Sequence, residues 1–337
     1  MTKLILSSSN IMGGGSSSMG PPSAQKSNTE LINSLRDNFE ASIDGVCYVE
    51  TNGNGTPQTN GNGVAASKGK LSYKTWTSSS PDGKTVYVPA LDFTNSQLQE
   101  EREQYDITVK LFYLPGVSQE RREAHTREAV DLVLKELHMP SVDLLIVSFP
   151  GVYFDEQQEG CCPDVVKSRG PVVAEPEPLE SQIETWKVLE KLHDEGTVVK
   201  LGLSEFGAER LEPFLEKTRI APAVDQINLR DCCSVPKSLM TLAKSRKIEL
   251  LVHNDCTNIL PRGTVRELLG PSDKGAGVLA AEREKTGEKR KEREGEESDQ
   301  GLRGEIEPQW VVKYTAVVKN RGVVENKGYF AVAELQD

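Results

Sequence analysis

Side chains that could handle protons or bind a small anion stand at the ends of apolar segments of this 337-residue chain. They are a lysine, two serines, a glutamate and a histidine, namely Lys110, Ser148, Ser204, Glu205 and His253. A lysine and a histidine can tune or relay a proton, whereas a serine hydroxyl hardly ionises near neutral pH. The positions therefore predict a polar site at the ends of these segments.

The run His253-Asn254-Asp255 follows the apolar segment IELLV. It could act as an acid–base group, or it could form a hydrogen-bonded loop or a cap at an interface. One histidine and one carboxylate are a weak set of metal ligands, because protein metal sites generally need three or four. No metal site is predicted.

Six cysteines are scattered along the chain without a CxxC pair, so reduced thiols are expected. Cys232 and Cys233 are adjacent at the end of an apolar segment. An exposed thiol there could form a mixed disulfide with a partner, and cysteine is equally common as a small buried hydrophobe. Both interpretations stay open, and the pair is a candidate for redox chemistry or for an interface.

Short apolar segments alternate with longer helical patterns from Tyr105 onward. The apolar segments are 107–113, 142–147, 198–203, 224–229 and 248–252, and the helical patterns between them are 125–138, 183–193, 208–217 and 236–244. Such alternation predicts an α/β fold with parallel strands and covering helices. In barrels of this kind the site lies where the strands end, which is where Lys110, Ser204, Gln226 and His253 stand.

Other segments have compositions typical of tails, linkers or local elements. Residues 1–28 are rich in Gly, Ser and Pro and predict a disordered tail. The remaining residues, 29–337, are expected to form one domain, with flexible insertions at 51–70, 151–178 and 270–308. Apolar residues from Ile32 to Ile43 recur at helical spacing, and the turn Pro81-Asp82-Gly83 predicts a hairpin within 73–88.

The charge balance restricts the kind of partner. Forty Lys and Arg residues against 51 Asp and Glu residues give a net charge of −11. This balance argues against nucleic acid or an anionic membrane as the main partner. No apolar run is long enough for a membrane span or a signal-peptide core, so a cytoplasmic location is expected.

Several segments in the correct order resemble the aldo-keto reductase family. They are ITVKL, VDLLIV, LGLSEFGAERLEPFL at 201–215 and PAVDQIN at 222–228. The resemblance implies a (β/α)8 TIM-barrel-like fold, with the number of strands in the N-terminal half left open. Active members use Asp, Tyr, Lys and His around the substrate carbonyl. Lys110 matches the lysine, Ser148 replaces the histidine, and no tyrosine follows Asp92 at the expected spacing.

The cofactor positions implied by the resemblance are also altered. Glu205 follows Ser204 where the family has a Ser-Asn pair, and His253 replaces a ring-stacking aromatic, while Gln226 is retained and Lys327 matches a phosphate-contacting lysine. An ionised glutamate only accepts hydrogen bonds, whereas an amide also donates them. These positions are therefore vestigial candidates. A divergent NADPH-dependent reductase remains the alternative function, with Lys110 either paired to a carboxylate or retained as an anion contact.

The C-terminal half resembles a narrower family, the regulatory (modifier) subunits of glutamate–cysteine ligase. The segments are VDQINLRDCCSVP at 224–236, IELLVHND at 248–255 and WVVKYTAVVKNRGVVENKGYF at 310–330. The resemblance implies a non-catalytic chain that forms a heterodimer with the ligase catalytic subunit. In glutathione biosynthesis it would improve glutamate use and relieve inhibition by glutathione.

Overall fold

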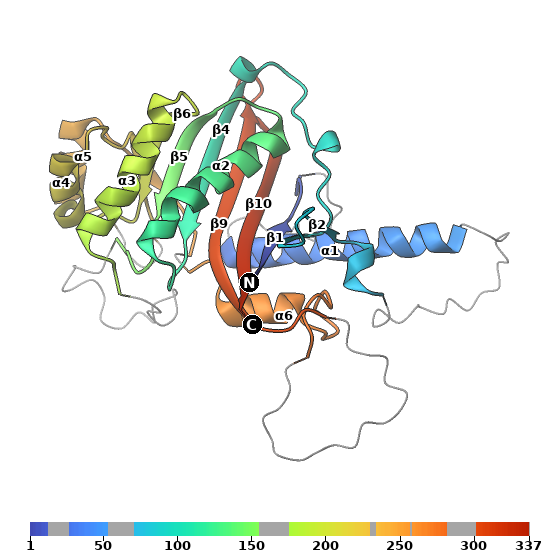
Figure 1. The fold of residues 1–337 in the computed structure, drawn as a ribbon. Coiled ribbons are helices and arrows are strands. Elements are labelled where there is room, and N and C mark those ends of the chain that lie inside the picture. The colour runs from blue at the N-terminus through green and yellow to red at the C-terminus, as the bar shows by residue number, and fades with distance from the viewer. Residues whose placement is uncertain are drawn as a thin grey trace, which may run out of the picture.

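The computed structural model describes residues 1–12, 27–52, 71–154, 175–229, 234–256, 258–281 and 301–336. Its strands form one mixed sheet in the order β2-β3-β1-β10-β9-β4-β5-β6-β7-β8 (Figure 1). In that order the strands are Ser78–Ser79, Thr85–Val88, Thr2–Ser7, Val323–Gln336, Glu305–Val318, Tyr105–Tyr113, Val142–Ser148, Val198–Ser204, Val224–Ile227 and Glu249–Val252.

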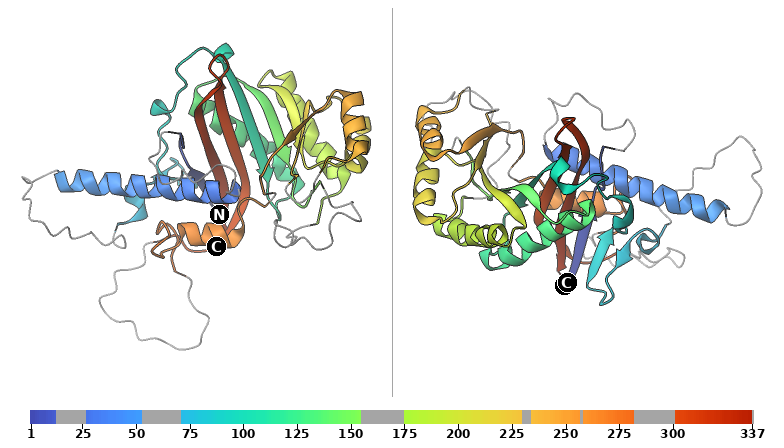
Figure 2. Two further views of the ribbon diagram at one scale, coloured as in Figure 1. Left: turned by 180° about the vertical axis from the view of Figure 1, so that it is seen from behind. Right: turned by 90° about the horizontal axis from the view of Figure 1, so that it is seen from above.

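Helices cover both faces of this sheet. Helices α2 to α5 follow the parallel strands on one face, and α1 crosses the opposite face over β9 and β10, with α6 near the end where the termini meet (Figures 1 and 2). From α1 to α6 they are Ser27–Asn52, Arg122–Leu137, Leu179–Asp194, Ala208–Lys217, Lys237–Arg246 and Arg262–Leu269. Single-turn 3-10 helices lie at Tyr73–Thr75, Phe93–Asn95, Arg102–Gln104 and Gln119–Arg121.

The parallel half, β4 to β8, is the predicted alternation of strands and helices. Each strand pairs in parallel with the next along the chain. The strands are buried because helices cover them, and alternate residues such as Ile107, Val109 and Leu111 are fully buried in the core beneath α2 to α5. Among the described residues β8 pairs only with β7, so the barrel is incomplete and the sheet stays open.

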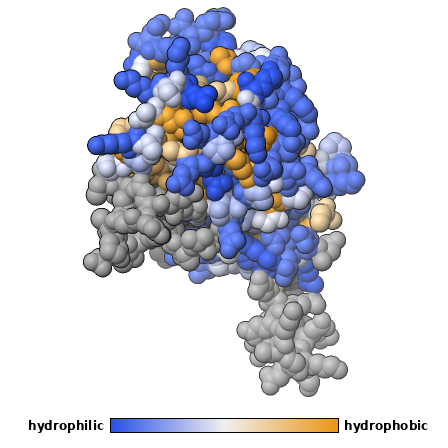
Figure 3. All heavy atoms as spheres, turned by 90° about the vertical axis from the view of Figure 1, so that its left-hand side faces the viewer, coloured by the Kyte–Doolittle hydropathy of each residue, from blue (hydrophilic) through white to orange (hydrophobic). Residues whose placement is uncertain are grey.

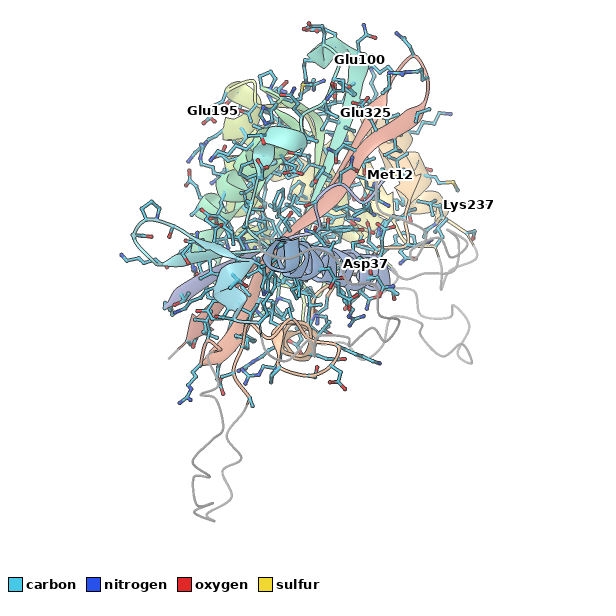
Figure 4. The ribbon with its side chains drawn as sticks, turned by 90° about the vertical axis from the view of Figure 1, so that its right-hand side faces the viewer. Met12, Asp37, Glu100, Glu195, Lys237 and Glu325 are labelled. Atoms are coloured by element: carbon cyan, nitrogen blue, oxygen red, sulfur yellow. The ribbon has the colours of Figure 1, made fainter. Side chains whose placement is uncertain are left out.

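The antiparallel half is built around the β9–β10 hairpin, which inserts between β4 and β1. The turn of this hairpin is held by Arg321, which pairs with Glu100, while Glu325 accepts a hydrogen bond from Tyr105 (Figure 4). In the view along α1, Glu100 and Glu325 both lie at the end of the sheet beyond the helix.

The prediction of a disordered tail over 1–28 is wrong for residues 2–7. These residues form β1, which pairs antiparallel with β10 and parallel with β3. Leu4 and Leu6 are fully buried in a second core with α1 and α6. The short apolar stretch forms a strand because partners lie on both sides of it, and residues 13–26 lie outside the described ranges.

The predicted insertions are shorter than expected. Helix α1 runs through Asn52, Val152 and Phe154 are buried at the start of the second segment, and Val278 and Leu279 are buried in the third. Leu279 forms a bridge with Leu302 and so fixes both ends of the third segment. Apolar side chains that complete the two cores account for these differences. The rest of the segments, 53–70, 155–174 and 282–300, lies outside the described residues.

Two local predictions are confirmed. Helix α1 packs Leu35 and Phe39 into the second core, and Ile43 packs partly against it. The hairpin forms with Ser78 opposite Tyr87, although its strands are shorter than predicted because Tyr73–Thr75 is helical.

Candidate functional site

The strand register gathers the predicted polar residues on one face of the sheet. Ser204 pairs with Gln226 across β6 and β7, and Gln226 pairs with Leu251 across β7 and β8, so His253 follows two residues further on the same face. Lys110 of β4 reaches this group directly, because its Nζ donates to Oε1 of Gln226 at 2.9 Å. The parallel strands thus bring together in space residues that are more than a hundred positions apart in the sequence.

Lys110 forms a buried ion pair with Asp255. Its Nζ lies 2.9 Å from Oδ2 of Asp255, and Lys313 of β9 approaches Oδ1 of the same carboxylate at 3.3 Å. Burial raises the pKa of Asp255, but the charges of the two lysines outweigh this effect and hold it well below its usual range. Burial lowers the pKa of Lys110, and the nearby Asp255 opposes that effect. The lysine therefore has a fixed internal counter-ion.

His253 and Glu205 form the second contact of the group. Nε2 of His253 lies 2.8 Å from Oε1 of Glu205 and 3.2 Å from Oγ of Ser204. The amide of Asp255 donates to Nδ1 at 3.0 Å, so a neutral ring carries its proton on Nε2 and donates it to Glu205. Burial, helped by the charge of Lys110, lowers the pKa of His253, which favours this neutral form.

The backbone at Glu205 is left-handed, with a φ of 68°. Asparagine tolerates this region better than glutamate does, since its short side chain can bond locally. Here the conformation aims the carboxylate inward, where Oε2 accepts from the amide of Phe154 at 3.0 Å. The substituted glutamate thus ties the end of β6 to the segment that follows β5.

Asp225, the neighbour of Gln226 on β7, is a buried acidic residue that sequence reasoning missed. It is fully buried on β7, where Oδ1 accepts from the amide of Phe206 at 3.3 Å, and Oδ2 has no hydrogen-bond partner among the described residues. Burial raises its pKa well above the usual range, and the nearby charge of Glu205 adds to the effect. A lone aspartate inside the apolar strand VDQIN was the available signal.

Two predicted positions stand apart from this group. Ser148 is buried at the end of β5, where it pairs with Phe112 of β4. Lys327 is bound by Glu30 of α1, whose Oε1 lies 2.7 Å from its Nζ. Asp255, which the sequence suggested either as part of an acid–base group or as part of a hydrogen-bonded loop, takes a central place instead, as does Lys313, which was not considered.

The arrangement does not fit a nicotinamide cofactor. The side chains of Gln226, Glu205 and His253, which would face the cofactor, bond to each other or to Lys110, and Lys327 bonds to Glu30. The carboxylate of Glu205 stands where an uncharged amide donor would be needed. No group of side chains suited to a metal occurs within the described ranges, and Cys232 and Cys233 lie outside them. The described Cys256 is half-buried.

Comparison with known proteins places this geometry in a family. The sequence model of the aldo/keto reductase family matches residues 82–258, more than half of the chain. The chain belongs to the aldo-keto reductase family. The matched range contains Lys110, Ser148, Ser204, Glu205, Gln226 and His253, so the altered positions lie within the family's own framework.

Within this family, the chain is similar over most of its length to proteins described as glutamate–cysteine ligase regulatory subunits. The one from Bos taurus is 27% identical over 266 residues, which cover 77% of this chain and 79% of the relative. The one from Homo sapiens is 26% identical over the same shares. None of the helices in the described ranges combines the length and apolar content that a bilayer crossing needs.

Solved reductases match a smaller part. An aldose reductase from Schistosoma japonicum is 30% identical, with 44% of this chain and 46% of that chain covered and a TM-score of 0.33. A Bombyx mori aldo-keto reductase in complex with NADP is 20% identical, with 46% and 42% covered and a TM-score of 0.32. The match spans less than half of each solved reductase.

Proposed function

We propose that this chain is a non-catalytic regulatory subunit of glutamate–cysteine ligase. It binds the catalytic subunit as a heterodimer, improves the use of glutamate and relieves inhibition by glutathione. The partner supplies the ATP-dependent ligation, and this chain supplies a binding surface on an aldo-keto reductase framework. A cytoplasmic location accompanies this role.

One observation carries the proposal, namely the internal neutralisation of Lys110. Its amine is bonded to Asp255 and Gln226, and the buried Ser148 stands where the family's histidine is expected. Loss of a general acid or base typically lowers a rate by roughly a hundredfold to ten-thousandfold. The chain retains the framework of the family. Of the groups that would reduce a carbonyl, the histidine is replaced by Ser148, and Lys110 is already bonded to Asp255 and Gln226.

Similarity to regulatory subunits over about three quarters of the chain supports the same role. Regulation of this kind is a coupling between two binding events. The chain must favour a state of the catalytic subunit that binds glutamate better, and by reciprocity glutamate must strengthen the complex.

The test is co-purification of the chain with the catalytic subunit, followed by ligase kinetics with and without it. We expect a 1:1 complex, a lower KM for glutamate and weaker inhibition by glutathione. An active aldo-keto reductase of similar size is the matched control and should change neither quantity. A catalytic subunit that neither binds the chain nor changes its glutamate dependence and glutathione inhibition would refute the proposal.

A divergent NADPH-dependent reductase is the second candidate function. It is favoured by the retention of Ser204 and Gln226, which pair across β6 and β7, and of Lys110 of β4, which bonds to Gln226. Against it stand the contacts already made by these residues and the carboxylate of Glu205. Cofactor titration separates the two functions.

A further inference from the structure

The last strand of the sheet, β8, pairs with β7 on one side, and its other side faces no strand of the described residues. The amides of Glu249 and His253 donate inward to carbonyls of Ala223 and Ile227, at 2.9 and 3.1 Å. Alternate residues of a strand point their amides the same way, so those of Leu250 and Val252 face outward. Among the described residues no strand lies beyond β8.

Apolar side chains accompany this open side. Val252 is 63% exposed, and Met240 on the preceding helix α5 is 46% exposed. In a repeating unit of strand and helix, the helix after β8 would cover Val252, but α6 packs against β9 instead. From the side where α4 and α5 lie, an apolar patch is visible among hydrophilic residues (Figure 3).

A basic group flanks the same strand. Helix α5 and the residue that ends it expose Lys237, Lys244, Arg246 and Lys247, without an acidic residue between them. None of the four forms an ion pair within the part of the chain that the structure describes. Lys237 lies at the rim of the molecule (Figure 4). This concentration of positive charge occurs in a chain whose net charge is −11. It favours an acidic partner.

The opposite edge of the sheet is protected in a way that β8 is not. Its outer strand, β2, has two residues, Ser78 and Ser79, and ends at a turn that contains Pro81. Short polar strands with a nearby proline resist pairing with another chain. The strand β8 carries one exposed charge, Glu249, but its other three residues are apolar and include the exposed Val252, which is the pattern of an edge that another strand covers.

We infer that the β8 edge, defined as Glu249–Val252 together with helix α5, binds an extended segment of the ligase catalytic subunit. The segment adds a strand beside β8, contacts Val252 and Met240 with aliphatic side chains, and places acidic residues against Lys244 and Arg246. This inference rests on the proposed function and names the surface through which it operates.

The experiment measures the dissociation constant of the full-length chain and the purified catalytic subunit by biolayer interferometry. Val252→Pro removes one outward amide and leaves the bonds to β7 intact, since proline is tolerated on an edge strand when its nitrogen faces away from the ladder. We expect it to weaken binding by about tenfold or more. Val252→Ile keeps the amide and the apolar contact and should bind as the wild type does.

A charge-reversal pair tests the basic group. Lys244→Glu with Arg246→Glu should weaken binding by about tenfold at low salt, and by less at high salt because ions screen the interaction. The matched control reverses Lys74 and Lys84, which are exposed in the half of the chain that precedes the parallel strands, and should leave binding unchanged. Circular dichroism and thermal unfolding establish that each variant is folded.

The outcomes separate the surface from the function. If the wild type binds and regulates the catalytic subunit but folded Val252→Pro and the α5 reversal bind equally well, the docking surface is wrong and the proposed function stands. If the wild type fails to bind, the proposed function itself is rejected. A wild-type chain that is a dimer by itself, and a monomer as Val252→Pro, would assign the edge to a second copy and overturn the inference.

Discussion

The amine of Lys110 and the carboxylate of Asp255 lie 2.9 Å apart, with both side chains buried, and join the first and last strands of the parallel half. The lysine stands on β4, and the aspartate follows β8, 145 positions later. Lys110 therefore forms its ion pair with a residue of the same chain and not with a substrate or cofactor. The main effect of this ion pair is on the stability of the folded chain.

Asp255→Asn should destabilise the chain strongly. The change leaves Lys110 buried without its counter-ion, a loss that typically costs about 3–5 kcal/mol. Chemical denaturation monitored by circular dichroism measures the free energy of unfolding. The double variant Lys110→Met with Asp255→Leu removes both charges and should be destabilised less than Asp255→Asn, and an equal or larger loss would contradict the pairing.

NADPH should not bind. Glu205 and His253 are bonded to each other, and the carboxylate would meet the cofactor where an amide is needed. Titration with NADPH monitored by its fluorescence is expected to give no saturable change, with an active aldo-keto reductase as the positive control. Saturable binding together with aldehyde turnover, both lost on Lys110→Ala, would instead support the reductase.

His125 should make stability fall on acidification. Burial, with the charge of Arg121, lowers the pKa of His125 to about 4, from about 6.5 in an unfolded chain. Between these values the unfolded chain binds the proton and the folded chain does not, so stability declines as the pH falls through this window. His125→Leu should lose stability less steeply between pH 6.5 and 4 than the wild type, as measured by denaturation at several pH values. Parallel pH profiles for the two chains would refute this role.

Gly202→Ala should destabilise the centre of the sheet. An added Cβ would lie 3.0 Å from a side-chain carbon of Ile146 and 3.3 Å from the carbonyl oxygen of Val224. Overpacking of this kind costs about 1–3 kcal/mol. Gly263→Ala in α6 is the matched control, because its Cβ would meet nothing within 4 Å. It should stabilise the chain by about 0.5–1 kcal/mol, and thermal unfolding measures both.

Sequence reasoning predicted the polar residues at parallel strand ends more successfully than the elements around them. Ser204, Gln226 and His253 follow apolar runs, and parallel strands bring such ends together whatever the intervening loops do. Lys313 could not be found in this way, because it lies on the antiparallel strand β9 and reaches Asp255 from there. Its partner in the register is Lys110 of β4, 203 positions earlier in the chain, and no local pattern indicates that pairing.

The other errors have the same origin in distant partners. The segment at 2–7 has too few apolar residues to be recognised as a strand, and it becomes one through pairing on both sides. Lys327 was assigned to a phosphate by resemblance, but Glu30 of α1 binds it. The proposed redox role of Cys232 and Cys233 stays a prediction, and serine replacements that leave an oxidant-dependent change in complex stability unaltered would refute it.

The pairing of β1 with β10 can form only late in the synthesis of the chain. Thr2 lies opposite Leu335, so the antiparallel partner of β1 lies 333 positions later in the chain and is translated long after β1 itself. During synthesis the apolar side of β1, with Leu4 and Leu6, remains without this partner while the parallel half can already assemble. Chaperone binding to nascent chains should therefore concentrate on the segment that contains β1 and decline only once β10 has been made.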